Sequence, residues 1–197
     1  MNHAENLRKH FEEGIELRTR MAQSMPEKIA RAGEALAHAL KAGKKVLSCG
    51  NGGSAADSQH FAAELVGRFE RERPGLAGIA LTTDTSALTA IANDYDFDRV
   101  FSKQVEALGQ PGDFLLAIST SGNSKNVIAA IRSAQARGMR VIALTGRDGG
   151  EMGRMLRDDD FHLNVEHPRT MRVQEIHLLA VHCLCEVVDN VIFGEKR

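Results

Sequence analysis

The stretch CGNGGSAADSQHFAAE, residues 49–64, decides which fold this chain is expected to adopt. The apolar run Val46 to Cys49, which leads into it, is typical of a buried strand. A glycine-rich turn comes next, and an alanine-rich segment of high helix propensity follows. Free backbone N–H groups and the helix dipole point into such a turn, so this order of elements favours anion binding. His60 and Glu64 lie four residues apart on one face of the helix, which predicts an active site.

The composition excludes several classes of protein. With 197 residues, 43% of them hydrophobic and 26% charged, the chain is expected to form one domain with a sizeable core. A net charge of -1 argues against nucleic-acid and membrane partners. We find no apolar stretch near the ~18 residues of a transmembrane helix and no signal-peptide pattern. The three cysteines have no CxxC spacing, which favours buried thiols in a reducing, cytoplasmic environment.

Short apolar runs alternate with helical patterns from residue 45 onward. Strands are expected at 46–49, 78–81, 114–118, 141–144 and 161–165. Helices are expected at 54–67, 86–108 with a break near Asn93-Asp94, 123–137 and 172–191. This alternation predicts an α/β fold, a parallel five-stranded sheet with helices on both faces.

The N-terminal region carries two further helical patterns. Residues 4–23 place Leu7, Phe11 and Ile15 on one stripe, and a second helix runs to about Gly43. Two amphipathic helices are more than one sheet face requires, so their surplus apolar surface predicts packing between subunits. We therefore expect a single domain, 1–197, in which 1–43 is a helical oligomerisation region and 44–197 is the α/β core.

Small polar residues follow four of the predicted strands. In open α/β sheets the ligand lies outside the carboxyl ends of the strands, near the point where strand order reverses. The loop STSGNS, residues 119–124, combines four hydroxyl groups with a helix start and is suited to a phosphate monoester. An ordinary serine N-cap is the alternative interpretation. The Walker and GxGxxG patterns are absent, so neither a nucleoside triphosphatase nor a dinucleotide enzyme is favoured.

The last predicted helix, 172–191, offers possible partners for His60 and Glu64. It carries the polar residues Gln174, Glu175, His177 and His182. Spacing alone pairs Glu175 with His182, while Gln174 lies about 80° away round the helix but is long enough to converge.

Two chemistries fit these residues. Two histidines with carboxylate or amide oxygens suit zinc or a similar divalent ion. A carboxylate base facing a histidine acid also suits proton transfer through an enediol without a metal, and a zinc-bound histidine is no longer a free acid. The alternative is a satisfied polar His60 and a solvated Glu64. The residues leave these possibilities open.

Two other polar clusters are less specific. Asn93-Asp94 either ends a helix or contacts substrate. Arg68, Arg71 and Arg73 alternate with two glutamates, which predicts a solvated, self-paired surface.

Together these motifs resemble sugar-isomerase (SIS) domains, and more specifically the phosphoheptose isomerase family. The resemblance rests on the segments 50–54, 57–64, 68–74, 80–84, 89–95, 119–124, 143–150 and 173–177, and it covers nearly the whole chain after about residue 44. It implies a flavodoxin-like or Rossmann-like three-layer fold and a homotetramer with sites between subunits. It also implies isomerisation of sedoheptulose 7-phosphate to D-glycero-D-manno-heptose 7-phosphate, the first step of lipopolysaccharide heptose biosynthesis.

The resemblance also implies roles for individual residues. The phosphate is expected on Ser119, Thr120, Ser121 and Ser124. The remaining substrate contacts are expected from Asn51, Gly52, Gly53, Ser54, Glu64, Asn93, Asp94 and Gln174. One zinc ion per subunit is expected on His60, Glu64, Gln174 and His182. Glu64 and His182 are also the implied base and acid, and the resemblance favours Gln174 over Glu175.

A second branch with this fold binds the initiator protein of chromosome replication and has no catalysis. The presence of both Glu64 and Gly53 favours the enzyme, although parts of the chain resemble both branches. A sugar-phosphate sensor without turnover is a third, weaker alternative.

Overall fold

The computed structural model describes residues 2–195, so residues 1, 196 and 197 of the expected domain lie outside the described part. The elements in chain order are α1 (His3–Ser24), α2 (Pro26–Lys41), β1 (Val46–Gly50), α3 (Gly53–Val66), β2 (Gly78–Ala80), α4 (Thr85–Asp94), the 3-10 turn η1 (Phe97–Arg99), α5 (Ser102–Leu108), β3 (Phe114–Ser119), α6 (Lys125–Ala136), β4 (Arg140–Gly146), α7 (Gly150–Arg154), β5 (Phe161–Val165) and α8 (Thr170–Phe193).

The five strands form one parallel sheet in the order β2-β1-β3-β4-β5. This is the flavodoxin-like order, in which strand order reverses between β1 and β3. Gly50 of β1 pairs with Ile118 of β3, so the residues that follow both strands emerge side by side at the same edge. The prediction of a parallel five-stranded α/β fold is confirmed.

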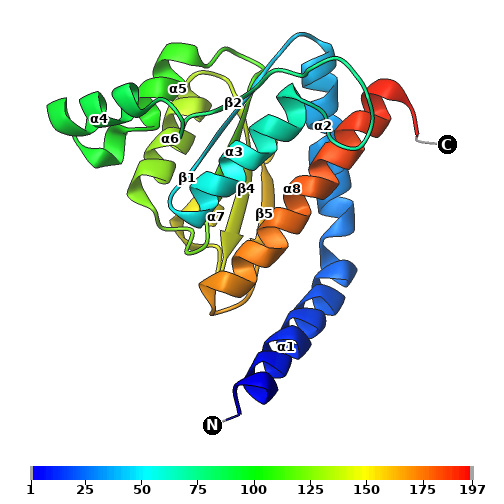
Figure 1. Ribbon diagram of the computed structural model, residues 1–197. Coiled ribbons are helices and arrows are strands. Elements are labelled where there is room, and N and C mark those ends of the chain that lie inside the picture. The colour runs from blue at the N-terminus through cyan, green and yellow to red at the C-terminus, as the bar shows by residue number, and fades with distance from the viewer. Residues whose placement is uncertain (1, 196–197) are drawn as a thin grey trace.

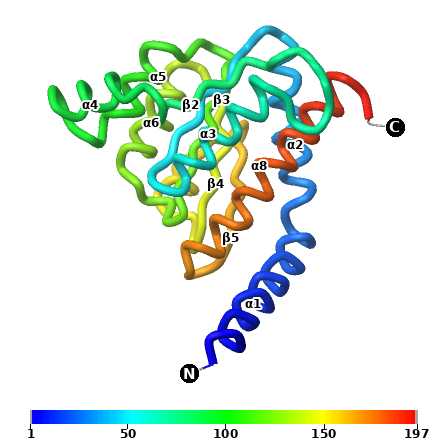
Figure 2. The backbone as a smooth tube through the Cα atoms, viewed as in Figure 1, coloured from blue at the N-terminus to red at the C-terminus, as the bar shows by residue number. Residues whose placement is uncertain are grey.

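Alternate residues of each strand pack on opposite faces of the sheet, which gives two cores. In β3, Phe114, Leu116 and Ile118 join the core under α2, α3 and α8, whereas Leu115 and Ala117 join the core under α5 and α6. Figures 1 and 2 show α3 and α8 lying together on one face and α4 projecting at the side away from α8.

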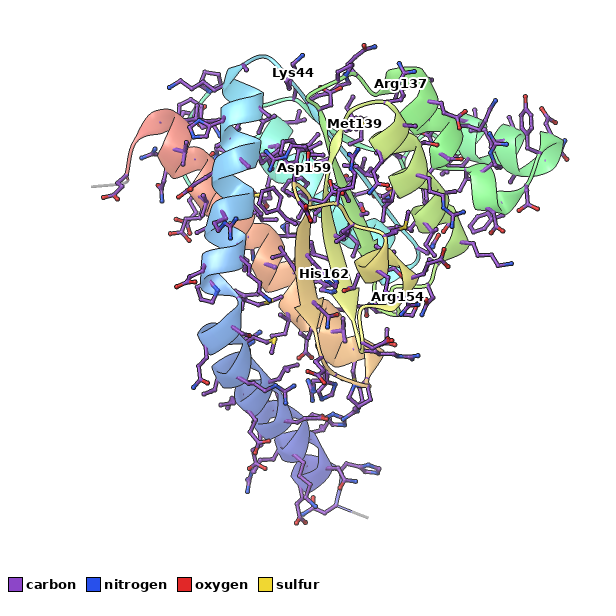
Figure 3. All side chains as sticks on the ribbon, turned by 180° about the vertical axis from the view of Figure 1, so that it is seen from behind. Lys44, Arg137, Met139, Arg154, Asp159 and His162 are labelled. Atoms are coloured by element: carbon purple, nitrogen blue, oxygen red, sulfur yellow. The ribbon has the colours of Figure 1, made fainter. Side chains whose placement is uncertain are left out.

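Two ends of the sheet can be told apart when the molecule is seen from behind. Lys44 and Met139, which precede β1 and β4, lie at the amino end, and Arg154 of α7 lies at the carboxyl end (Figure 3). The binding loops expected from the sequence leave the sheet at the carboxyl end.

Helix α7 is the helix that the sequence did not predict. The helix expected over 86–108 is broken after Asp94, as predicted, but the five-residue helix α7 was not expected.

Helix α8 is long and apolar enough to cross a membrane by composition, with a mean hydropathy of 1.7. The expectation that no apolar stretch approaches that length is therefore wrong. Because α8 packs against α2 and α3, it serves in this fold as a core helix.

Helix α1 extends away from the domain (Figure 1). Of its described residues only Leu17 and Met21 are buried. The stripe predicted from the sequence, Leu7, Phe11 and Ile15, is exposed in the single chain. The predicted role of this region in oligomerisation stays a prediction.

Candidate active site

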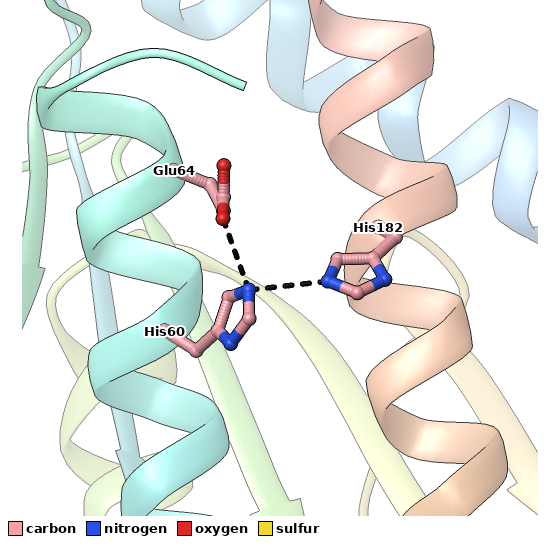
Figure 4. Close-up of side chains that lie close together, drawn as sticks. All are labelled: His60, Glu64 and His182. Atoms are coloured by element: carbon pink, nitrogen blue, oxygen red, sulfur yellow. Dashed lines mark hydrogen bonds and ion pairs between the residues drawn. The ribbon is translucent and has the colours of Figure 1, made fainter. Parts of the chain in front are cut away.

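His60 and Glu64 of α3 meet His182 of α8 in the seam between the two helices (Figure 4). His60 Nε2 lies 3.0 Å from Glu64 Oε1 and 3.1 Å from His182 Nε2. All three side chains are part-exposed, so small molecules can reach them. The i,i+4 spacing predicted the first contact, and the packing of α8 against α3 supplies the second.

The donor atoms of this triad fit a divalent metal. Three ligand atoms, one from each residue, all lie within 4.8 Å of one another. Tetrahedral zinc with bonds of ~2.0–2.2 Å places its ligand atoms roughly 3.3–3.6 Å apart, a few tenths of an ångström more than the two contacts of His60. Two histidine nitrogens and a carboxylate also bring more lone pairs together than one shared proton can satisfy. The arrangement suits a cation as well as a proton relay.

The hydroxyl loop, residues 119–124, leaves the carboxyl end of β3. Ser119 Oγ lies 2.9 Å from Ser124 Oγ and 3.4 Å from Ser121 Oγ, so three hydroxyl groups converge. Ser124 is the N-cap of α6 but its side chain makes no capping hydrogen bond. The first N–H groups of α6 and the converging hydroxyls therefore face the same space, as a phosphate site requires.

This loop is held in place by backbone packing. Gly122 adopts a φ of 66°, a left-handed conformation that favours glycine. A Cβ atom at Gly122 would lie 2.5 Å from the carbonyl carbon of Gly149 and 2.9 Å from the nitrogen of Gly150. Met152 N also donates to Gly122 O at 2.9 Å. The loop between β4 and α7 is thus the support on which the hydroxyl loop rests.

The first loop, residues 50–54, is held by side chains. Asn51 and Asn126 form a reciprocal amide pair, in which each Nδ2 donates to the other Oδ1 at 2.9 Å. Asn126 lies in the first turn of α6 and is buried, so the pair joins the first loop to the hydroxyl loop. Asn126 was missed in the sequence because an asparagine in an expected helix carries no signal. Beyond this pair, the amide of Asn51 has a second N–H and a second lone pair on Oδ1.

Gln174 lies beside the first loop rather than beside the triad. A Cβ atom at Gly53 would lie 3.0 Å from Gln174 Cδ and closer still to Nε2. Gln174 precedes His182 by eight residues, which is ~12 Å along a helix axis. This separation and the contact with Gly53 place Gln174 outside the set formed by His60, Glu64 and His182 within one chain.

Glu175 does not take the place that spacing suggested for it. Its carboxylate accepts two hydrogen bonds from Arg172 Nη1, at 2.7 and 2.8 Å, and lies near Gly14 of α1. The pairing of Glu175 with His182 is wrong, because Glu175 faces α1 and His182 faces α3.

The remaining predicted contacts lie apart from the seam. Asn93 and Asp94 end the exposed helix α4, where Asn93 Nδ2 donates to Asp94 Oδ1 at 2.8 Å. Ser54 is buried and its carbonyl accepts from Ser58 Oγ, so it supports the start of α3. Gly52 is exposed.

Two titratable groups near these elements are perturbed by burial. His177, in α8, is fully buried, and desolvation lowers its pKa to about 4 although its Nε2 lies 2.9 Å from Thr145 O. His177 is therefore neutral, and its Nε2–H donates to the carbonyl oxygen of Thr145. Thr145 lies near the end of β4 and is the register partner of Ser119 in β3. Burial raises the pKa of Asp57 on α3, and the charge of His60 opposes that rise.

The prediction of a solvated, self-paired arginine cluster is wrong at Arg73. Arg68 is exposed and pairs loosely with Glu72, at 3.8 Å, as expected. Arg73 instead is buried and forms an ion pair with Asp189 at 2.9 Å. The partner is far away in the sequence, so the local charge pattern gave no indication of it.

Comparison with known proteins gives a consistent result. The SIS domain family profile matches residues 9–146. The chain is 56% identical over 192 residues to a phosphoheptose isomerase of Methylibium petroleiphilum, covering 98% of this chain and 96% of the relative. The structure of phosphoheptose isomerase from Neisseria gonorrhoeae superimposes with a TM-score of 0.92 at 54% identity, over 96% of this chain and 100% of the other. That of a phosphoheptose isomerase from Francisella tularensis gives 0.94 at 43% identity with the same coverage. The chain is a SIS-domain protein and belongs to the phosphoheptose isomerase family.

Proposed function

We propose that the α3–α8 seam and the two loops together convert sedoheptulose 7-phosphate to D-glycero-D-manno-heptose 7-phosphate, the first step of lipopolysaccharide heptose biosynthesis. The observation that carries the proposal is the convergence of Glu64 and His182 through His60. An aldose–ketose isomerase must move one proton from C1 to C2, and a carboxylate and an imidazole within hydrogen-bonding reach are suited to that task.

The reaction has four proton movements. Glu64 takes a proton from C1 of the ketose, and the carbonyl oxygen on C2 gains a proton as the enediol forms. The O1 hydroxyl then loses its proton, and C2 gains one to give the aldose. Glu64 is the base, and His182 is the acid at the oxygens. Nothing is oxidised by an outside group, because C1 and C2 exchange oxidation states.

A zinc ion is the proposed cofactor, one per subunit, with His60, Glu64 and His182 as ligands and Gln174 as the fourth. When bound, zinc supplies Lewis-acid polarisation of the carbonyl. Since Gln174 lies ~12 Å along α8 from His182, the fourth ligand comes from a neighbouring copy of the chain. His182 bound through Nε2 is no free acid, so the zinc and proton-relay roles compete at this residue.

The phosphate and the sugar bind at the carboxyl end of the sheet. Ser119, Thr120, Ser121 and Ser124 hold the phosphate, and the first loop, Asn51 to Ser54, approaches the sugar. Asn93 and Asp94 contact the sugar from α4. Glu64 is eleven residues along α3 from Gly53, ~17 Å by the helix rise, which is long for one substrate. A homotetramer with shared sites removes this difficulty, and residues 1–43, with the exposed stripe of α1, assemble it. We place the enzyme in the cytoplasm.

The decisive test is turnover of sedoheptulose 7-phosphate by the wild-type protein with zinc supplied. Glu64→Gln is expected to abolish turnover while substrate affinity and the oligomer are kept. Glu72→Gln is the matched control, because it neutralises an exposed carboxylate in the loop between α3 and β2. This variant is expected to stay active. A wild-type protein that forms no aldose phosphate contradicts the function. Elemental analysis addresses zinc, since fully active protein without metal contradicts that assignment.

The adaptor for a replication initiator is not favoured, because the relatives reported above all carry the isomerase name. A pull-down with the initiator protein that retains nothing above background removes it. Turnover of sedoheptulose 7-phosphate by the wild-type protein would also exclude the sensor without turnover.

A further inference from the structure

The return loop, residues 67–77, connects the end of α3 to the start of β2. Its Arg73 is buried, with 1% of the side chain exposed. A guanidinium in a protein interior is costly unless its donors are matched by acceptors. The partners of Arg73 therefore indicate which parts of the molecule it joins.

Arg73 caps the carboxyl end of α3. Its Nη2 donates to Glu64 O at 2.7 Å and its Nη1 to Leu65 O at 2.6 Å. Longer hydrogen bonds run from Nη1 to Gly67 O and Pro74 O, at 3.4 and 3.2 Å. The last carbonyls of a helix lack intrahelical partners and carry the negative end of its dipole, so a cation there is doubly favourable. The strongest of these contacts include the backbone of Glu64 itself.

The same guanidinium reaches α8. Arg73 Nε donates to Asp189 Oδ1 at 2.9 Å, and 6% of the Asp189 side chain is exposed. Asp189 follows His182 by seven residues and so lies almost on the same face, two turns further on. The return loop adds two more contacts with α8. Arg71 Nη1 donates to Asp189 O at 3.4 Å, and the ring of Phe69 stacks on His182 with centroids 5.9 Å apart.

We infer that Arg73 and Asp189 are positioning residues, which fix α3 against α8 and so hold Glu64 and His182 at their working separation. This inference rests on the function proposed above. The two helices carry the reacting groups between them, and contacts of 3.0 and 3.1 Å leave little room for sliding. The Arg73–Asp189 clamp ties the backbone of one reacting residue to the helical face of the other.

The choice of variants follows from the burial of the clamp. Asp189 Oδ2 is buried without a hydrogen-bond partner, so Arg73 is what compensates this carboxylate. Full removal of Arg73 leaves an uncompensated charge and endangers folding. Arg73→Lys keeps the positive charge but loses the fork that spans several carbonyls and Asp189. Asp189→Asn keeps an acceptor of the same shape and removes the opposite charge.

A second ion pair, with a buried carboxylate and a part-exposed lysine, gives a control. Lys45 Nζ lies 2.5 Å from Asp113 Oδ2, and 1% of the Asp113 side chain is exposed. This pair lies where β1 and β3 begin, at the opposite end of the sheet from the binding loops. Asp113→Asn therefore removes the charge of a buried, ion-paired carboxylate, as Asp189→Asn does, without touching α3 or α8.

The experiment measures kcat and KM on sedoheptulose 7-phosphate, and the affinity and visible spectrum of Co²⁺ in place of zinc. For Arg73→Lys and Asp189→Asn we expect kcat to fall roughly 10- to 100-fold, with KM within about threefold of wild type. Co²⁺ affinity is expected to fall roughly 10- to 100-fold with altered absorption bands, as for the loss of an outer-shell partner. Asp113→Asn is expected to lower the melting temperature and to leave these values within about twofold.

Three results decide the matter. Wild-type kcat and Co²⁺ spectra in both clamp variants overturn the inference. Equal losses in Asp113→Asn, at the same drop in melting temperature, also overturn it, because the effect is then one of stability alone. An inactive wild-type protein contradicts the proposed function instead, and the Co²⁺ arm still decides whether the clamp positions the triad.

Discussion

The two loops at the carboxyl end of the sheet are held in opposite ways. The hydroxyl loop, 119–124, is fixed by backbone contacts, since Gly122 packs on Gly149 and Gly150 with no space for a side chain. The first loop, 50–54, is fixed by side chains, through the amide pair with Asn126 and the contact of Gly53 with Gln174.

In the function proposed above, the hydroxyl loop holds the phosphate and the first loop approaches the sugar, and the difference then separates two demands on a sugar-phosphate site. A phosphate group has one shape in every substrate, and a rigid backbone support suits it. The sugar changes its bonding during isomerisation, and a loop held by amide groups can exchange hydrogen bonds with it. Substitutions in the support of the hydroxyl loop are therefore expected to act on the fold and on binding together, and those in the support of the first loop mainly on the interaction with the sugar.

The largest expected effect is that of Gly122→Ala. The new Cβ meets backbone atoms that cannot give way, in a left-handed conformation that alanine disfavours. Together these costs amount to about 3 kcal/mol of the free energy of unfolding, and a displaced loop is expected to weaken substrate binding roughly 100-fold. Urea denaturation and calorimetric titration with sedoheptulose 7-phosphate measure the two effects.

Gly138→Ala isolates the cost of the backbone conformation. Gly138 has a φ of 68°, almost that of Gly122, but its nearest neighbour is Pro111 Cβ at 3.5 Å, an ordinary contact. We expect a loss of about 1 kcal/mol and unchanged affinity. If Gly122→Ala and Gly138→Ala lower stability and affinity equally, the claim that Gly149 and Gly150 support the hydroxyl loop is contradicted.

Asn126→Asp is expected to have the next largest effect. It replaces an amide donor by a carboxylate oxygen that faces Asn51 Oδ1, in a position that is 3% exposed. A cost of about 2 kcal/mol corresponds to a fall of about 30-fold in kcat/KM. The loss should shrink as the pH falls, because a protonated carboxyl group can donate to Asn51 again. A pH-independent loss contradicts this explanation.

Gly53→Ala tests the contact with Gln174. The added methyl group displaces the flexible amide of Gln174, and stability is expected to stay within about 1 kcal/mol because alanine favours the helix. We expect KM to rise roughly tenfold, as one hydrogen-bonding group leaves the site. Gln174→Ala provides the control. If the two substitutions act through one contact, the double variant has the KM of Gln174→Ala alone, and additive effects contradict the proposal.

At neutral pH the smallest effect is expected from His177→Gln, which is seen as a change in the pH dependence of stability. Burial lowers the pKa of His177 to about 4, so the unfolded chain binds the extra proton between about pH 6.5 and pH 4. Stability is therefore lost as the pH falls through this window. From pH 7 to pH 5 the loss amounts to about 2 kcal/mol for the wild type. The variant should lack this pH-dependent loss of stability. If the denaturation curves of variant and wild type shift equally with pH, the lowered pKa of His177 is contradicted.

The sequence predicted the sheet because its strands are short apolar runs separated by turn residues. The observed strands lie within two residues of the predicted ends, and the break after Asp94 was also predicted. Helix α7 was missed because five residues after Gly149 contain too few apolar positions to show a period. Local periodicity therefore predicts the main strands and helices, but not short helices whose position depends on the packing of loops.

The candidate site was predictable only in its local parts. The contact between His60 and Glu64 follows from their spacing, whereas His182 joins them through the packing of α8. The Arg73–Asp189 pair and the Asn51–Asn126 pair span 116 and 75 residues of the chain, and no local pattern announces them. Glu175 was misassigned because helical spacing alone does not say which neighbour a face meets.

Helix α8 has a consequence for synthesis of the protein. It follows every other described element in the chain, and it packs on α2, whose last residue, Lys41, precedes its first, Thr170, by well over half the chain. During translation the apolar residues of α2 and α3 that pack on α8 therefore stay uncovered until α8 leaves the ribosome. The triad has no His182 before that moment, so the chemistry proposed for it becomes available in one late step, when the core under α8 is closed.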